Sequence, residues 1–233
     1  MIGVSARSFS PGLLRFLREL AEDNRREWFA ANKERYEREV RGPALMFVGA
    51  MSEILEGLAP HVVADPRSNG GSLMRQHRDV RFSKDKSPYK RHVGIAFRHE
   101  AGKINAAPGF YLHIEPGACF FAVGMWRPDR VPLAAIRTAI AARPGAWRGV
   151  LEGDAFRKSF ALDGESLKRA PKGFDPTHEQ IDDLRRKDFV GTAALTHAQV
   201  QGPGFLECIE SHVRAALPLN RFLADAIGVP FGG

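Results

Sequence analysis

The stretch FYLHIEPGACFFAVGMW, residues 110–126, alternates apolar with other side chains on both sides of a Pro-Gly dipeptide. A period of two is typical of β-strands that bury one face, and Pro-Gly is a common turn signal. This stretch therefore predicts two antiparallel strands, Phe110–Glu115 and Cys119–Trp126, joined by a tight turn.

The same period extends upstream of this stretch. It predicts two further strands, Leu73–Phe82 and Tyr89–Arg98, with connections at 83–88 and 99–109. Connections this short favour an antiparallel meander. We therefore expect a four-stranded meander over about residues 73–126.

Helical periodicity flanks the meander on both sides. The chain is predicted to be a single α+β domain over residues 1–233, with N-terminal helices and a largely helical C-terminal half. Gly42-Pro43 is expected to break a helix. Residues 192–195 are interpreted as a short edge strand, and the helices are expected at about 10–21, 24–41, 44–58, 133–142, 154–161, 177–187, 196–201 and 204–227.

Composition indicates an ordinary globular protein of 233 residues, 44% hydrophobic and 26% charged. No apolar run approaches the roughly 18 residues of a membrane span, and the first residues lack a secretory pattern. We therefore expect a cytoplasmic protein without a membrane partner. Two distant cysteines, Cys119 and Cys208, argue against a disulfide framework.

Most of the excess charge lies in residues 75–98, RQHRDVRFSKDKSPYKRHVGIAFR, which hold eight basic and two acidic residues. The run carries +6 of the +7 of the whole chain. Crowded like charges destabilise a compact state unless something anionic offsets them. The run therefore predicts an anionic partner, most simply a small molecule bearing phosphate or carboxylate.

A loop at 83–88 would place Arg81 opposite Lys90 and Asp79 opposite His92 on one polar face of the sheet. Phe82, Tyr89, Arg78 and Arg91 would then point to the core, and strand alternation adds side chains of the next strand to the polar face. The expected polar floor consists of Arg75, Asp79, Arg81, Lys90, His92, Tyr111, His113 and Glu115, above the small residues Ala122 and Gly124.

Each group on this floor has a chemical role to offer. Arginine and lysine bind anions, and carboxylates beside imidazoles suit acid–base work. We predict ligand binding by Arg81, Lys84, Lys90 and Tyr111, and the candidate catalytic residues are Asp79, His92, His113 and Glu115. The sequence leaves open whether the protein is an enzyme. As an alternative to ligand binding, Asp79, Arg81 and Lys90 could form a salt-bridge network with a purely structural role.

Cofactor and metal signatures are missing. There is no P-loop, GxGxxG, HExxH, GxSxG or CxxC pattern, so no cofactor is expected. Two or three imidazoles with a carboxylate would suit a transition metal, but the neighbouring Arg and Lys charges disfavour a cation. No metal is therefore expected. The side chains that could act as ligands to one are His77, Asp79, His92, His113 and Glu115.

Two other classes of function remain open. The basic hairpin 75–98, with two aromatic residues, could bind nucleic acid through charge and stacking. The helices of the C-terminal half could instead serve a non-catalytic interaction module. A pocket would favour the small ligand, and an open basic stripe would favour nucleic acid.

Five segments together resemble a known family. They are REWFAANKERYEREV (26–40), RDVRFSKDKSPYKRHVG (78–94), GFYLHIEP (109–116), VGMWRPD (123–129) and LKRAPKGFD (167–175). In this order they resemble the conserved hypothetical proteins of the domain of unknown function 2461 family, over about residues 9–223. The resemblance implies no particular chemistry. His77 lies outside the matched pattern, which weighs against a metal site that needs it.

Overall fold

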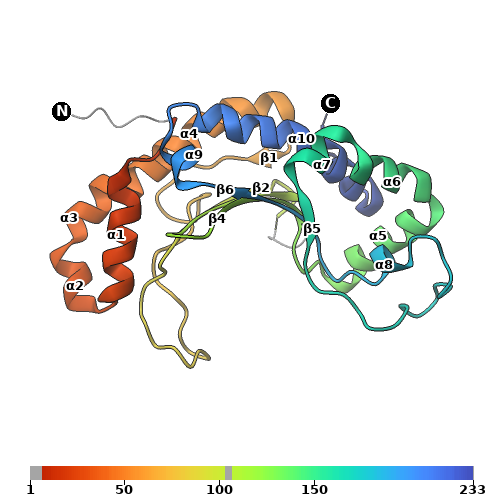
Figure 1. Cartoon of the computed structure of the whole chain (residues 1–233), viewed down its shortest axis with the longest axis horizontal. Coiled ribbons are helices and arrows are strands. Elements are labelled where there is room, and N and C mark those ends of the chain that lie inside the picture. Colours follow the sequence, from red (N-terminus) through yellow and green to blue (C-terminus); the bar gives the residue numbers. More distant parts are fainter. Residues whose placement is uncertain (1–6, 103–106, 233) are drawn as a thin grey trace.

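A single antiparallel sheet with strand order β1-β2-β3-β4-β6-β5 organises the molecule (Figure 1). The computed structural model describes residues 7–102 and 107–232. The strands are β1 (Val62–Val63), β2 (Val93–His99), β3 (Gly109–Ile114), β4 (Cys119–Met125), β5 (Ala161–Asp163) and β6 (Phe189–Leu195).

Helices form the rest of the framework. They are α1 (Pro11–Glu22), α2 (Arg26–Ala31), α3 (Lys33–Tyr36), the π-helix η1 (Glu37–Arg41), α4 (Gly42–Leu58), α5 (Arg130–Ala142), α6 (Pro144–Glu152), α7 (Asp154–Ser159), α8 (Ile181–Leu184), α9 (His197–Gln201) and α10 (Phe205–Ile227). Helix α10 packs on β4, and α4 packs on β1 and β2. Figure 1 shows the sheet as an arch with α4 and α10 on its convex side.

The core lies between these helices and one face of the sheet. Ile95, Leu112 and Phe121 pair across β2, β3 and β4 and are fully buried, as Ile209 and Val213 of α10 are. The α+β class is therefore confirmed. Strand alternation correctly predicted which side chains of β3 and β4 face the core, because one sheet face must be covered by apolar groups.

The four-stranded meander needs correction. Three of its strands are present as β2, β3 and β4, but residues 73–82 form no continuous strand and make only the isolated bridges Leu73–Ile95 and His77–Tyr89. The strands β1, β5 and β6 were not in the expected meander. Residues 103–106 of the expected connection 99–109 lie outside the described residues.

The expected register between 73–82 and 89–98 is wrong. Met74 bonds Gly94 and Gln76 bonds Lys90, so one residue on the first segment lies opposite three on the second. The two extra residues bulge from the ladder. With His77 paired to Tyr89, Asp79 falls opposite Ser87 rather than His92, and Arg81 no longer faces Lys90.

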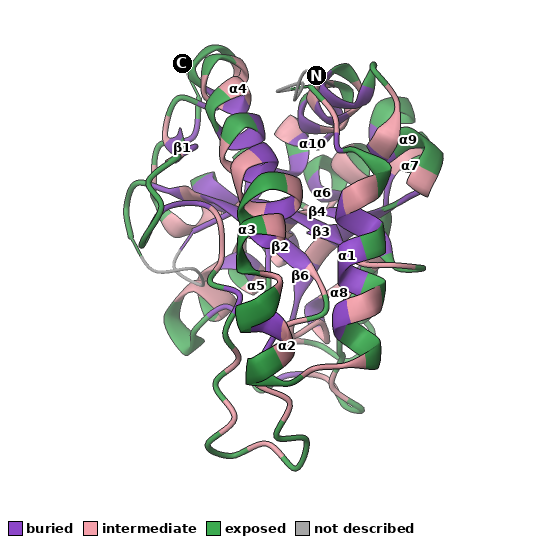
Figure 2. Cartoon of the chain, turned by 90° about the vertical axis from the view of Figure 1, so that its left-hand side faces the viewer, coloured by how far each residue is buried: buried purple, intermediate pink, exposed green. Residues whose placement is uncertain are grey.

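Residues 78–88 instead form a projecting hairpin (Figures 1 and 2). Phe82 was expected in the core but is 96% exposed, and Arg91 is also exposed. Tyr89 is buried as expected and stacks on Phe29 at 4.1 Å between ring centroids. The Asn24 amide bonds the backbone N–H and C=O of Tyr89, which fixes the base of the hairpin to the α1–α2 loop.

The expected helix 24–41 is divided into α2, α3 and η1. Gly42-Pro43 does not break the chain's helical path, because the N–H of Gly42 bonds the carbonyl of Glu37 five residues back and the chain runs on into α4. A π-turn is wider than an α-turn. This widening takes up the misfit of a proline in a continuous helix.

In the C-terminal half the structure also differs from two of the expected elements. The helix expected over 177–187 is reduced to the four residues of α8. The edge strand expected at 192–195 is the end of the longer strand β6, which pairs with β4 over Phe189–Leu195. On the other side of β6, β5 pairs only with Val190–Thr192, so residues 193–195 have no β5 partner. None of the described helices has the length and apolar character needed to cross a membrane.

Candidate functional site

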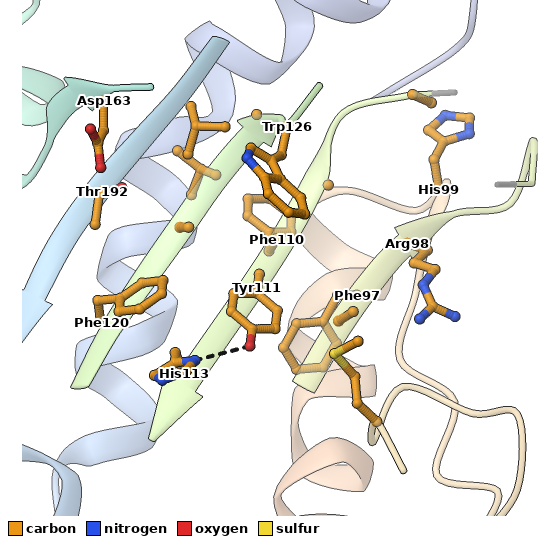
Figure 3. Close-up of a pocket in the computed structure, with 18 of the residues that line it drawn as sticks. Phe97, Arg98, His99, Phe110, Tyr111, His113, Phe120, Trp126, Asp163 and Thr192 are labelled. Atoms are coloured by element: carbon orange, nitrogen blue, oxygen red, sulfur yellow. Dashed lines mark hydrogen bonds between the residues drawn. The ribbon is translucent and has the colours of Figure 1, made fainter. Parts of the chain in front are cut away.

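A pocket of about 440 Å³ lies on the sheet face opposite α4 and α10 (Figure 3). Cross-strand pairing arranges its floor in rows. Ala96, Tyr111, Ala122 and Thr192 form one row, and Gly109, Gly124 and Val190 form the next. Ring walls come from Phe120 and Trp126, among other lining residues. Pockets of this size hold small organic molecules.

Small residues leave room at several positions in and beside the pocket floor. Gly124 has φ +105, and a Cβ there would lie 2.1 Å from the carbonyl oxygen of Phe189. A Cβ on Gly94 would lie 2.8 Å from the hydroxyl of Tyr111. Ala122 and Gly124, the small residues expected beneath the polar groups, both line the pocket. Ala122 pairs with Tyr111, whereas Gly124 pairs with Gly109 and Val190.

Polar side chains converge at one end of the pocket. The Tyr111 hydroxyl lies 3.0 Å from Nδ1 of His113, and His113 Nε2 lies 2.9 Å from Oε2 of Glu115. The ring of His92 lies 4.3 Å from that of His113. Strand alternation predicted that Tyr111, His113 and Glu115 share one face, and the structure places His92 beside them.

Burial determines the protonation states of His92 and Tyr111 at this end of the pocket. Desolvation, together with the nearby His113 and Lys90, lowers the pKa of His92 to about 4, so its imidazole is neutral at pH 7. Burial, together with the charge of Glu115, raises the pKa of Tyr111 to about 12, so its hydroxyl keeps its proton. The Tyr111 hydroxyl can therefore donate to Nδ1 of His113, which leaves Nε2 of His113 to donate to the carboxylate of Glu115. A hydrogen-bond chain thus joins a half-exposed carboxylate to a hydroxyl in the pocket.

Arg98 lines the pocket on the β2 side and is not among the site residues predicted from the sequence. Its Nε is buried without a hydrogen-bond partner, and within residues 7–102 and 107–232 the side chain makes no ion pair. The alternation that selected His92 also places Gly94, Ala96 and Arg98 on the same face. The alternation along this strand could therefore have predicted Arg98 as a site residue.

The other predicted site residues lie in or beside the hairpin rather than in the pocket lining. Asp79 pairs with Arg81 at 2.7 Å, and Lys84 is exposed. Lys90 is half-buried, and burial together with Arg75 lowers its pKa. Within the described residues no ion pair joins Lys90 to Asp79, so the expected three-residue network is reduced to the Asp79–Arg81 pair.

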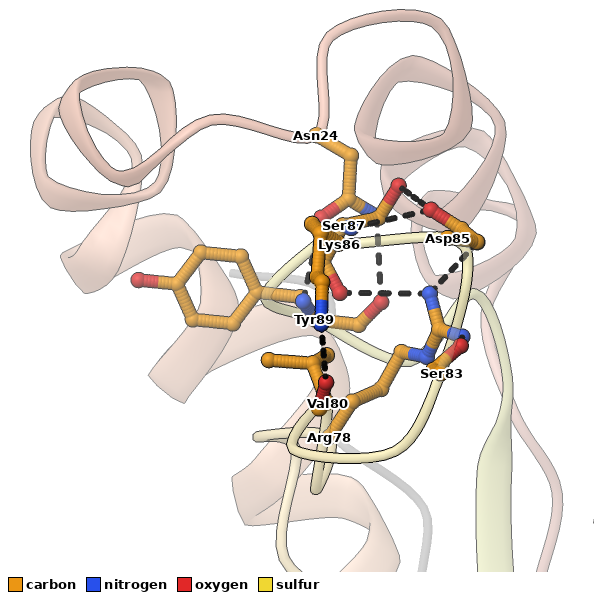
Figure 4. Close-up of polar contacts among 8 residues, drawn as sticks. All are labelled: Asn24, Arg78, Val80, Ser83, Asp85, Lys86, Ser87 and Tyr89. Carbon is orange, nitrogen blue, oxygen red and sulfur yellow. Dashed lines mark hydrogen bonds and ion pairs between the residues drawn. The ribbon is translucent and has the colours of Figure 1, made fainter.

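The charges of the hairpin hold its own backbone (Figure 4). Arg78 bonds Asp85 at 2.6 Å and the carbonyl of Ser87 at 3.2 Å. Asp85 accepts from the N–H of Ser87 at 2.9 Å, and Lys86 donates to the carbonyl of Val80 at 3.0 Å. Side-chain bonds therefore shape this loop, which explains why it is wider than the turn expected at 83–88.

Comparison with known families identifies the chain's relatives. The model of a family of conserved hypothetical proteins, DUF2461, matches residues 12–222. The chain belongs to this family. The match spans the sheet, the pocket and the hairpin, in agreement with the resemblance seen in the sequence. No curated protein and no solved structure matches the chain.

Proposed function

We propose that this DUF2461 protein is a cytoplasmic protein that binds a small organic molecule bearing a phosphate or carboxylate group in the sheet-face pocket. The observation that carries the proposal is Arg98, a pocket-lining arginine whose buried Nε has no partner among the described residues. A buried donor without a hydrogen-bond partner is costly, and here it belongs to a positively charged group. An anionic ligand would remove that cost.

The rest of the pocket suits the organic part of such a ligand. Phe120, Trp126 and Met74 contribute apolar groups to the pocket lining, and the Tyr111 hydroxyl oxygen, whose proton is donated to His113, can accept a hydrogen bond. Few polar groups over a mostly apolar, rigid floor is the usual composition of small-molecule sites. A role in ligand binding for Arg81, Lys84 and Lys90 stays a prediction, since none of them lines the pocket.

Phenyl phosphate is a suitable probe, because its ring can meet the aromatic walls while its phosphate meets Arg98. Saturable binding should raise the melting temperature in proportion to the logarithm of ligand concentration. Arg98→Met removes a charged hydrogen bond worth about 1.5–3 kcal/mol, and we expect a loss of about 10- to 150-fold in affinity.

Arg91→Met is the matched control. Arg91 is an exposed arginine of the same basic run and does not line the pocket, so its loss should leave affinity unchanged. Absence of any saturable shift with phenyl phosphate, inorganic phosphate or benzoate would reject the proposal. Equal losses from both arginine variants would show that binding is only general electrostatic attraction.

The second candidate function is single-stranded nucleic-acid binding by the hairpin, which the exposure of Phe82 favours. Its ring is 96% exposed, lies under the Arg81 guanidinium at 5.8 Å, and is free to stack on a base. Arg75, Lys84 and Arg91 have no ion pair within the described part of the chain.

Three such phosphate contacts predict a slope of about −2 for the logarithm of affinity against the logarithm of salt. We expect weak binding at physiological salt, measured by fluorescence anisotropy with a labelled oligonucleotide. Sub-micromolar binding at that salt, reduced by Phe82→Ala, would place this function above the small ligand.

A further inference from the structure

We propose that His92, His113 and Glu115 bind a divalent transition-metal ion at the polar end of the pocket. Their nearest nitrogen and oxygen atoms all lie within 4.8 Å of one another. Within the described ranges no other group of three such side chains converges in this way. Two imidazoles and a carboxylate form a donor set that suits zinc, iron(II) and related ions.

The hydrogen bonds around His113 support this assignment. A metal-bound histidine commonly donates its other ring N–H to an oxygen acceptor, which orients the ring. His113 Nε2 faces Glu115 at 2.9 Å, and its Nδ1 faces the Tyr111 hydroxyl oxygen at 3.0 Å. If metal takes Nε2, the ring proton moves to Nδ1 and is donated to the Tyr111 oxygen, which keeps its own proton.

Stacking on a neighbouring aromatic ring also fixes the orientation of the His113 ring. It stacks on Phe120 at 4.7 Å with an angle of 10° between the planes. A ligand side chain fixed by packing on one side and by a hydrogen bond on another loses little freedom on binding. Three protein ligands leave further coordination positions open, and His92 and His113 both line the pocket.

Glu115 is suited to be the anionic ligand. It is hydrogen-bonded to the His113 ring, and among the described residues no arginine or lysine pairs with it. By contrast, Asp79 and Asp85 are both held by arginines. A metal would supply the cationic partner that Glu115 lacks.

Positive charge nearby was the sequence-based argument against a cation. The structure weakens it, because Arg78 and Arg81 are paired with hairpin carboxylates. Lys90 remains close enough to act on His92. Lys90 should therefore reduce the affinity of the site without abolishing binding, and its removal should tighten metal binding.

The test uses the full-length protein, stripped with a chelator and titrated with Co²⁺ followed by visible absorption, and with Zn²⁺ in equilibrium dialysis. We expect one ion per chain. Glu115→Gln and His92→Asn should each lower affinity at least about 100-fold, and Tyr111→Phe about 10- to 100-fold. Lys90→Met should raise it several-fold.

The matched control is His61→Asn. His61 and Glu100 form a pair at 2.6 Å on the surface that does not belong to the three-ligand group, so this change should not alter binding. Melting temperatures identify variants that fail to fold, and Tyr111→Phe, which keeps the ligands and the ring, tests the site if a ligand variant does fail. No bound ion in the wild type, or equal losses from His61→Asn and Glu115→Gln, would overturn the proposal.

This test is independent of the proposed anion ligand, because the titrations contain no organic molecule. Arg98→Met should lose phenyl phosphate binding and keep the metal. Metal binding without phosphate binding would reject the proposed function alone, and the reverse result would reject the metal site alone.

Discussion

The sheet-face pocket and the projecting hairpin 78–88 are both rich in polar groups, but different parts of the chain hold those groups in place. In the pocket, neighbouring strands fix Tyr111 and His113 by cross-strand register. In the hairpin, Arg78 and Asp85 fix the backbone through their own side chains. The hairpin has the denser charge, yet much of that charge is used internally.

The difference teaches that charge density along a sequence is a poor guide to a site. Asp79–Arg81 and Arg78–Asp85 neutralise part of the basic run locally. Arg98, at the end of the same run, has no such partner among the residues described and lies beside the pocket. A charge that both lacks a local partner and lines a pocket is therefore more informative than one in a cluster.

The largest effect is expected in the pocket floor, from Gly124→Ala. The new methyl group would meet the Phe189 carbonyl in a backbone conformation that alanine rarely adopts, so we expect a loss of about 3 kcal/mol or more in the free energy of unfolding. Gly117→Ala is the control, since Gly117 also has positive φ but no atom near its Cβ. It should cost about 1 kcal/mol. Equal costs in urea denaturation would contradict this account of the floor.

An intermediate effect is expected where the two regions meet, from Asn24→Ala. The change removes both hydrogen bonds to the Tyr89 backbone and leaves buried peptide groups unpaired. We expect a loss of about 1–3 kcal/mol and faster hydrogen exchange of the Tyr89 amide. Unchanged exchange at Tyr89 would mean that packing of its ring on Phe29 and His77, and not Asn24, holds the hairpin.

Little effect is expected at the hairpin tip. Phe82→Ala removes an exposed ring, so stability should change by less than about 0.5 kcal/mol. Thermal unfolding measures this directly. A loss as large as that of Gly124→Ala would show that the tip packs against something in solution and would remove the contrast between the regions.

The smallest expected effect is the loss of stability at acidic pH that comes from Asp85 of the hairpin. Hydrogen bonds from Ser87, and then Arg78, hold the pKa of Asp85 well below its usual range. Because the folded pKa is the lower one, the favourable contribution is complete above the unfolded pKa of about 3.9 and is lost as pH falls through the folded value. We expect the NMR shift of the Ser87 amide to titrate below pH 4 while global stability barely follows it. Titration of that amide above pH 5 would exclude Asp85 as its acceptor.

Much of the sheet could be predicted because alternation is a local property. The alternating pattern alone predicts that Phe110, Leu112 and Phe121 are buried, whatever the rest of the chain contains. The strands β1 and β5 have two and three residues, too few to show a period. Their pairing depends on neighbours that are distant in sequence, and so does the position of β6 inside the sheet.

The site was predicted in part for the same reason. Tyr111, His113 and Glu115 follow one another at spacing two, so any strand brings them together. The position of Asp79 depended on a hairpin register, and the bulge opposite residue 75 shifted it. Bulges and side-chain-bonded loops leave weak signals in a single sequence.

The pairing of β4 with β6 has a consequence for synthesis of the protein. These strands pair from Cys119–Leu195 to Met125–Phe189, yet roughly 60 residues separate them along the chain. At about 5–20 residues per second, β6 follows β4 from the ribosome after roughly 3 to 12 s. Until then β4 presents an unpaired edge with apolar side chains, which is a template for aggregation. We therefore expect nascent chains that end before Phe189 to need a chaperone, and fragments truncated there to precipitate.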